Sequence, residues 1–412
     1  MGASSAISFD AWLREGVAFR HELHRHPELT WKERETAGRI RAQLDALGIP
    51  WTSCAETGTL GRLAPRAKGE HVALRADIDA LPIREKTGAP WASVHDGCMH
   101  ACGHDGHTAT LMLAARWLKA HEDALPGPVT LIFQPAEEGG HGAVKMIEGG
   151  ALAGVDSVFG WHNWPSLPFG QVLCPDRVVM AGNGTYDLDV IGEGGHASQP
   201  DRVKDPVLAA SAIVMALQQI LNRRIPTTDL AVVIVTSIVA PSAYTVVPSR
   251  ARIGGSFRYG RPELLETIER SIVEIAEQTA LAYGTRCEVT MHRRYDPTVN
   301  HPAEAARYRA VLAEELGCTI DPGAPPLMAS EDFGYYLQER PGAFALIGAG
   351  SDEATRRPCH HEGYDFNDAL IPHVVRAFAR VVGAPVPPPL EGERRTPRGT
   401  DRKEIGERQD GL

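Results

Sequence analysis

Short apolar segments that alternate with amphipathic ones are the feature that most constrains the fold of this chain. Apolar runs of strand length cover residues 71–76, 129–133 and 158–161, and helical patterns over 106–119 and 142–148 lie between them. Such alternation predicts an α/β domain built on a mixed, mostly parallel sheet, with polar side chains gathered at the carboxyl ends of its strands. Residues 9–47 precede these segments and have the apolar spacing of an amphipathic helix.

A different order of elements interrupts this alternation between Thr185 and Tyr295. The segment has the order β-α-β-β-α-β, which is that of a compact ferredoxin-like unit, and α/β character returns after it. We therefore predict two domains: a discontinuous one formed by residues 1–183 and 295–383, and an inserted one formed by residues 184–294. At 412 residues the chain is long enough for two cores. Residues 384–412 are rich in proline and charge, so we expect a disordered tail.

The charge and the apolar patterning exclude several classes of partner. A formal charge of -10 argues against nucleic acid, because affinity for nucleic acid depends largely on lysine and arginine. No apolar stretch approaches the roughly 20 residues that a membrane span needs, and the N-terminus lacks the pattern of a signal peptide. We therefore expect a cytoplasmic protein that acts on a small molecule.

Residues 99–107, MHACGHDGH, gather three histidines, a cysteine and an aspartate in nine positions. Buried side chains of these types are costly unless they are paired or bound to a metal. Cys102 and His104 can approach one centre only if the backbone between them is irregular, and Gly103 gives that freedom. Taken alone, the cluster predicts a metal site, with a metal-free catalytic cysteine and a solvated histidine loop as alternatives.

Further potential ligands follow other segments of the chain. Glu137 and Glu138 come directly after the second apolar run, where one carboxylate can bind a metal while its neighbour handles protons. The alternative for this pair is an acidic loop with its charges in water. His162 ends the third run, and the pair His360 and His361 lies in CHHEGYDFND. Two metal ions need more ligands than one segment provides, and these segments together supply them.

The chain carries eight short motifs in the following order: HELHRHPEL, RADIDALPI, MHACGHDGH, QPAEEGG, WHNWP, GGHASQP, SEDFGYY and HHEGYDFND. In these motifs, which span roughly residues 10–383, the chain resembles the M20 metallopeptidase family. It resembles in particular the amidohydrolase branch, which contains hippurate hydrolases, aminoacylases and auxin-conjugate hydrolases. His141 after EEGG and Asp201 after GGHASQP depart from the common forms of these motifs.

The resemblance implies a role for each matched residue at the metal site. Glu137 matches the general base. His360 is preferred to His361 because it lies four residues before Tyr364, which is the spacing of the motif. The implied metal ligands are Cys102, which matches the bridging ligand, with His104, Glu138, His162 and His360.

The resemblance also implies roles outside the ligand set. His196 matches a histidine of the inserted domain that in relatives reaches the active site of the partner subunit, so we expect a homodimer through an inserted lid and dimerisation domain. Asp77 and Asp79 are expected to orient ligands through hydrogen bonds. Arg258 and Asn300 are expected to contact substrate, with a surface arginine on a strand edge as the alternative for Arg258.

The implied activity is hydrolysis of the amide bond of N-acyl amino acids by a water that two divalent metal ions activate. Manganese or zinc is preferred, and cobalt and nickel also suit these ligands. The alternatives are a carboxypeptidase or dipeptidase of the same family, a thiol-dependent enzyme without metal, and a metal-binding regulatory protein without catalysis.

Overall fold

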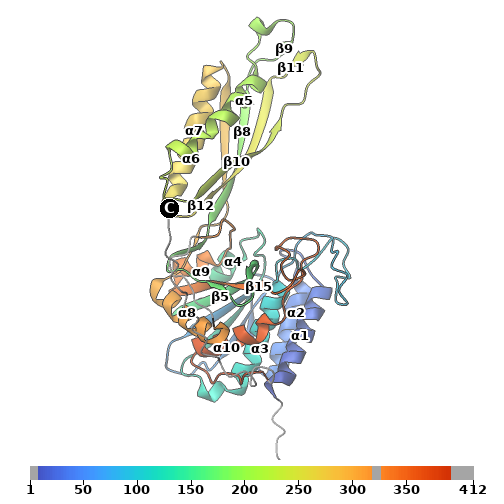
Figure 1. Ribbon diagram of the computed structural model, residues 1–412, viewed down its shortest axis with the longest axis vertical. Helices are drawn as coiled ribbons and strands as arrows, with labels where there is room; N and C mark the ends of the chain where they lie inside the picture. Colours follow the sequence, from blue (N-terminus) through green and yellow to red (C-terminus); the bar gives the residue numbers. More distant parts are fainter. Residues whose placement is uncertain (1–7, 318–325, 391–412) are drawn as a thin grey trace, which may run out of the picture.

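A computed structural model describes residues 8–317 and 326–390, which form two units, each built on its own sheet (Figure 1). The first unit holds a seven-stranded sheet whose four central strands run parallel, while the outer strands pair antiparallel. The expected α/β class with a largely parallel sheet is therefore confirmed. In spatial order the strands are β1 (Trp51–Cys54), β2 (Gly58–Leu63), β4 (Val129–Gln134), β3 (Val72–Asp77), β5 (Ser157–Pro168), β15 (Gly342–Gly350) and β6 (Val172–Leu173).

Helices cover both faces of this sheet because its central strands are apolar on both sides. Strands β3, β4 and β15 are buried along their whole lengths, which is the pattern of parallel strands between two helical layers. None of the helices in the described residues is both long and apolar enough to cross a membrane. One layer contains α1 (Phe9–Arg25), α2 (Arg34–Leu47), α3 (His104–Ala120), α8 (Pro302–Leu316) and α10 (Leu370–Val381), and the other contains α4 (Gly142–Glu148) and α9 (Gly334–Glu339).

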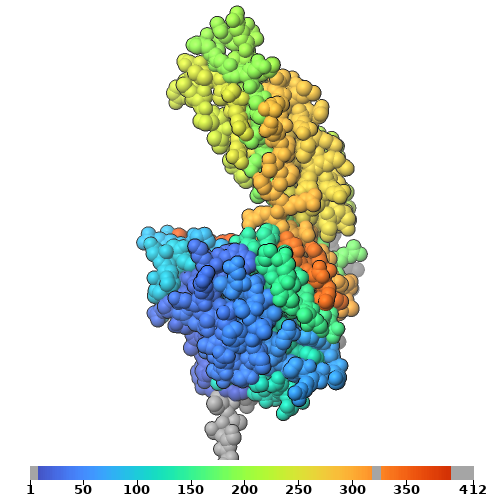
Figure 2. Space-filling view, turned by 180° about the vertical axis from the view of Figure 1, so that it is seen from behind, coloured from blue at the N-terminus to red at the C-terminus, as the bar shows by residue number. Residues whose placement is uncertain are grey.

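The second unit projects from the first and has a separate core (Figure 2). Its four strands are all antiparallel, in the spatial order β10-β12-β8-β13. One face of this sheet packs against helices, and the other carries ion pairs such as Arg250 with Asp189. The elements are β8 (Gly182–Ile191), α5 (Pro206–Leu217), α6 (Gln219–Arg223), β10 (Ala231–Val239), β12 (Arg250–Tyr259), α7 (Leu264–Ala282) and β13 (Arg286–Arg293).

Two small ribbons lie at opposite ends of the second unit. The ribbon of β9 (Gly195–His196) and β11 (Val246–Val247) lies at the end remote from the first unit (Figure 1). The ribbon of β7 (Val178–Met180) and β14 (Thr298–Val299) lies beside the points where the chain enters and leaves the second unit. The chain therefore crosses between the two units twice, near residues 181 and 295.

Two boundaries differ from the sequence-based expectation. The single helical stretch predicted over residues 9–47 is wrong: α1 ends at Arg25 and α2 begins at Arg34, because Pro27 disfavours helix at the residue before it. The predicted tail starts too early, since Leu390 packs on the first core and the carbonyl of Pro385 accepts a hydrogen bond from Trp117 Nε1. The rest of that tail, residues 391–412, lies outside the described residues.

The separate core of the second unit predicts how two substitutions in α7 affect stability. Ile268 is fully buried, whereas Leu281 on the same helix is 68% exposed. We expect Ile268→Ala to lower the free energy of unfolding by about 2–5 kcal/mol because it leaves a cavity. Leu281→Ala should change it by less than about 0.5 kcal/mol. Urea denaturation measures both, and equal effects would contradict this assignment of the core.

Candidate metal centre

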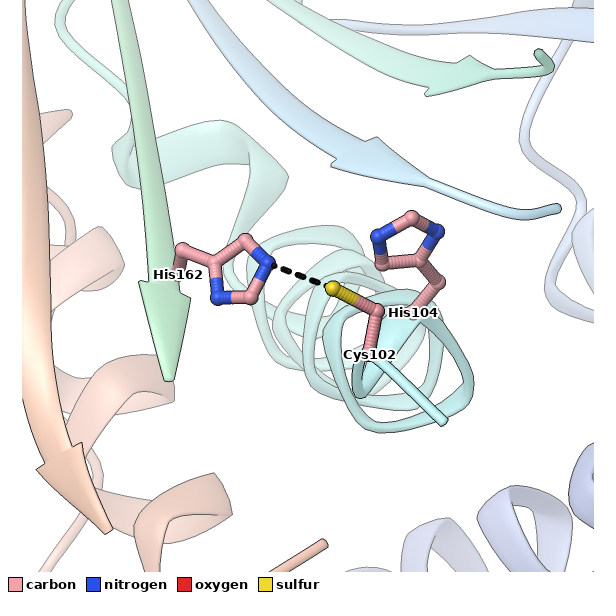
Figure 3. Close-up of side chains that lie close together, drawn as sticks. All are labelled: Cys102, His104 and His162. Carbon is pink, nitrogen blue, oxygen red and sulfur yellow. Dashed lines mark hydrogen bonds between the residues drawn. The ribbon is translucent and has the colours of Figure 1, made fainter. Parts of the chain in front are cut away.

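The start of α3 brings a cysteine and a histidine to the carboxyl ends of the parallel strands. Cys102 lies just before the N-cap Gly103 and His104 is the first residue of α3, and both face His162 on β5 (Figure 3). Cys102 Sγ lies 3.3 Å from His162 Nε2. Gly103 makes the approach possible, because its φ is +100° and a Cβ there would lie 2.2 Å from Asn163 Oδ1.

The Cys102 sulfur belongs to two sets of potential metal ligands. In one set Cys102, His104 and His162 have ligand atoms within 4.8 Å of one another, and in the other Cys102, Glu138 and His360 do. His360 Nε2 lies 3.2 Å from Glu138 Oε1. All five residues proposed from the sequence as ligands therefore converge, and the two sets share Cys102.

The orientation of the two buried histidines suits a metal. His104 Nδ1 donates to the carbonyl oxygen of Asp79 at 2.9 Å, and His162 Nδ1 donates to the carbonyl oxygen of Asn163 at 2.6 Å. A hydrogen bond at Nδ1 fixes the ring and leaves the Nε2 lone pair available for a metal. His104 Nε2 and Glu138 Oε1 are buried without a hydrogen-bond partner. Buried donor atoms that make no hydrogen bond fit a bound cation.

Buried carboxylates make the surroundings of the centre strongly negative. Arg75 offsets part of this charge, with ion pairs of 2.6 Å to Asp77 and 2.9 Å to both Glu331 and Asp332. Burial alone would lower the pKa of His104, but the charge of Asp77 and its other acidic neighbours raises that pKa well above its usual value. The negative electrostatic potential that favours a proton on His104 also favours a divalent cation at the same place.

A strained loop presents Glu137 beside the ligands. Ala136 adopts a positive φ of 57°, and the carboxylate of Asp79 accepts hydrogen bonds from the backbone N–H groups of Glu137 and Glu138 at 3.1 and 3.0 Å. Burial, and then the charges of Glu331 and Glu138, raise the pKa of Glu137 well above the usual range. Asp79 thus positions both the loop and His104.

A cavity of about 410 Å³ opens onto this centre. Arg258 lines it, and its Nη1 donates to the carbonyl oxygen of Met328 at 2.7 Å and to Ser330 Oγ at 3.2 Å. The cavity is lined by Cys102, Glu137, Glu138, Gly139, His162, Trp164, Met180, Asn183, Arg258, Arg294, Tyr295, Ala329, Ser330, Glu331, Cys359 and His360.

Two residues singled out from the sequence lie elsewhere. His196 lies exposed on β9, and its Nδ1 accepts from Ser198 Oγ at 2.8 Å, far from the metal ligands of its own chain (Figure 1). Asn300 is buried and is not among the residues that line the cavity, so the structure does not support the predicted substrate contact there. Its amide group instead bonds the backbone of Pro175 and, twice, that of Phe344.

Sequence reasoning did not single out two neighbours of the ligands. His107 Nδ1 lies 2.6 Å from Asp77 Oδ1, and its Nε2 lies 2.7 Å from Asn163 Oδ1. From one turn further along α3, His107 therefore links Asp77 to Asn163 beside the ligands. Its spacing of three residues from His104 places both on one helix face and could have indicated this. The side chain of Cys359 and then burial raise the pKa of Cys102 well above its usual value. No pattern in the sequence pairs these two cysteines.

Comparison with known proteins agrees with this geometry. The family model described as peptidase family M20/M25/M40 matches residues 73–384. N-acetyl-L-cysteine deacetylase of Bacillus subtilis (strain 168) is 37% identical over 369 residues, which cover 89% of this chain and 87% of the relative. Hippurate hydrolase of Campylobacter jejuni is 36% identical over 369 residues, covering 88% of this chain and 94% of the relative.

A solved structure from Bacillus subtilis, described as a dinuclear metal-binding peptidase of the M20 family, has a TM-score of 0.79 to this chain. Its sequence is 31% identical, and the match covers 90% of this chain and 98% of that one. The resemblance drawn from the eight motifs is confirmed. The chain therefore belongs to peptidase family M20/M25/M40 and is a hydrolase of amide bonds.

Proposed function

We propose that the chain uses two divalent metal ions to hydrolyse the amide bond of N-acyl amino acids. The observation that carries this proposal is the position of Cys102 Sγ, which is common to two sets of donor atoms beside the Glu137 carboxylate. A thiolate shared by two ligand sets suits a pair of ions better than a single one.

The donor types indicate which ions suit the centre. Cys102, His104 and His162 would hold one ion, and Cys102, Glu138 and His360 the other. Thiolate and imidazole suit zinc, cobalt and nickel, while the carboxylate also admits manganese, so we propose manganese or zinc first. Such ions, when bound, act as Lewis acids toward the amide carbonyl and toward water.

The proposed task of Glu137 is proton transfer. Its carboxylate takes a proton from the attacking water and later donates a proton to the departing amine nitrogen, so that an acid and a free amino acid leave. Burial, and then the neighbouring acids, raise the pKa of Glu137 and make its carboxylate a stronger base than a solvated glutamate. Asp79 holds the peptide of this loop, which keeps the carboxylate in place between substrate and ligands.

The cavity supports a substrate with a free carboxylate. We propose that the guanidinium of Arg258 binds that carboxylate, because it lines the cavity and makes no ion pair within the described residues. N-acetylcysteine and hippurate, the substrates named for two relatives, are both N-acyl amino acids with this group.

We propose that the second unit serves as lid and as the contact of a homodimer. Strand β10 is an edge of its sheet, and Ile234, Ile238 and Val239 on this strand are about half exposed. An apolar edge strand favours pairing with a second copy. His196 on the remote ribbon would then join the partner's site, where its imidazole would stabilise negative charge on the carbonyl oxygen.

Replacing the proposed base tests its role directly. Glu137→Gln keeps the size of the side chain but removes its ability to take a proton, so we expect kcat to fall by about 10²- to 10⁴-fold. The exposed Glu148→Gln on α4 is the control and should leave kcat unchanged. Metal content is measured alongside kcat. Near-normal turnover of Glu137→Gln with metal bound would contradict the assignment.

Metal removal tests the ions and the substrate class together. We expect a chelator to abolish release of free amino acid from N-acetyl and N-benzoyl amino acids, and added manganese or zinc to restore it. Dipeptides should be hydrolysed more slowly than the N-acyl compounds. Activity that survives complete removal of metal would refute the proposed centre, and faster hydrolysis of dipeptides would refute the substrate class.

Mixing two inactive variants tests the shared site. Glu137→Gln and His196→Ala should each be inactive alone. A mixed dimer has one site with both defects and one site with neither, so random exchange of subunits should restore about a quarter of wild-type activity. Activity is assayed after the two variants are mixed and allowed to exchange. A mixture that stays inactive although mass spectrometry detects mixed dimers would contradict a site completed by the partner.

A further inference from the structure

The segment that leaves the second unit touches the loop of the proposed general base. Asn183 and Tyr295 bond to each other where the chain crosses between the units: Asn183 N–H donates to the Tyr295 carbonyl at 2.8 Å, and Tyr295 N–H donates to the side-chain Oδ1 of Asn183 at 3.0 Å. These bonds join the entering and leaving segments into one hinge. The backbone of Tyr295 is therefore held in place between the two units.

The side chain of Tyr295 extends from this hinge to the turn formed by residues 137–139, which carries the proposed base. Its hydroxyl donates to the carbonyl oxygen of Glu137 and accepts from the N–H of Gly139 at 2.6 Å. The ring contacts His141, at the far end of the same loop, with centroids 4.9 Å apart. Tyr295 is buried, so removal of its hydroxyl leaves the Glu137 carbonyl and the Gly139 N–H without this protein partner.

The other contacts of this loop come from the first unit. Asp79 accepts from the N–H groups of Glu137 and Glu138, and Glu33 accepts from the N–H of Ala136 at 3.0 Å. These bonds satisfy backbone N–H groups of the loop. The Glu137 carbonyl oxygen instead accepts from the Tyr295 hydroxyl and from the Gly139 N–H. The loop also has positive φ angles at Ala136, Gly139 and His141, which it can keep only if its surroundings hold it.

We propose that Tyr295 is a positioning residue that fixes the Glu137 carboxylate by clamping the Glu137–Gly139 turn from the hinge of the second unit. The single hydroxyl proton is donated to the Glu137 carbonyl, so the hydroxyl does not also donate to substrate. Its effect on the reaction is exerted through Glu137, and this inference rests on the function proposed for that residue.

Kinetics with N-acetyl and N-benzoyl amino acids test the inference. Tyr295→Phe removes only the hydroxyl, and we expect kcat to fall by about tenfold or more, since small displacements of a catalytic group cost up to about 10²-fold. KM should stay within about twofold, because no substrate contact is lost. The control is Tyr335→Phe: Tyr335 Oη donates to the Arg294 carbonyl at 2.9 Å in the same hinge and lies 3.5 Å from His141 Nδ1, but it does not bond the Glu137–Gly139 turn. Both constants of this control should stay near wild type.

Hydrogen exchange of the metal-free protein gives a second readout that needs no activity. Amides of residues 137–139 should exchange faster in Tyr295→Phe than in wild type or Tyr335→Phe, while those of β3 and β4 stay protected. The inference is overturned if kcat and loop exchange match wild type, or if exchange rises throughout the first unit. A wild-type protein that hydrolyses no N-acyl amino acid would instead refute the proposed function, and loop exchange would still decide whether Tyr295 holds the turn.

Discussion

The centre depends on carboxylates that the fold holds away from water. Asp77, Glu331 and Asp332 all pair with the guanidinium of Arg75, and Glu137 lies close to the last two. One arginine cannot neutralise this many buried acids, and uncompensated buried charge is costly. Divalent cations bound at Cys102 would supply the missing positive charge. Metal binding and the stability of the folded centre are therefore expected to be linked.

The parallel strands explain how residues far apart in sequence meet at this centre. Strand β3 ends at Asp77, β4 ends just before the loop of Glu137 and Glu138, and His162 lies on β5, so neighbouring strands bring them to one edge of the sheet. The turn at Gly103 then directs Cys102 toward them from the start of α3. The second unit adds Arg258 and the hinge residue Tyr295 above this edge.

Much of the fold and of the ligand set could be predicted from the sequence, because apolar strands and the polar residues that follow them are local patterns. The class of the first sheet and the segments that carry the ligands follow from such patterns. The choice of Glu138 and His360 within their pairs follows from the resemblance to the family. The break at Pro27 was missed because the apolar spacing continues on both sides of it. The surroundings of Asn300 could not be predicted, because sequence does not show that backbone groups of distant segments use its amide. The contacts of Cys359 and Tyr295 likewise depend on tertiary packing.

Cys102 is proposed to bind both metal ions of one centre. Anomalous diffraction from crystals grown with manganese tests this most directly, because it locates each ion independently of activity. We expect two separate anomalous peaks in each chain, both bonded to Cys102 Sγ, with His104 and His162 on one side and Glu138 and His360 on the other. A single peak, or peaks that do not touch Cys102, would contradict it.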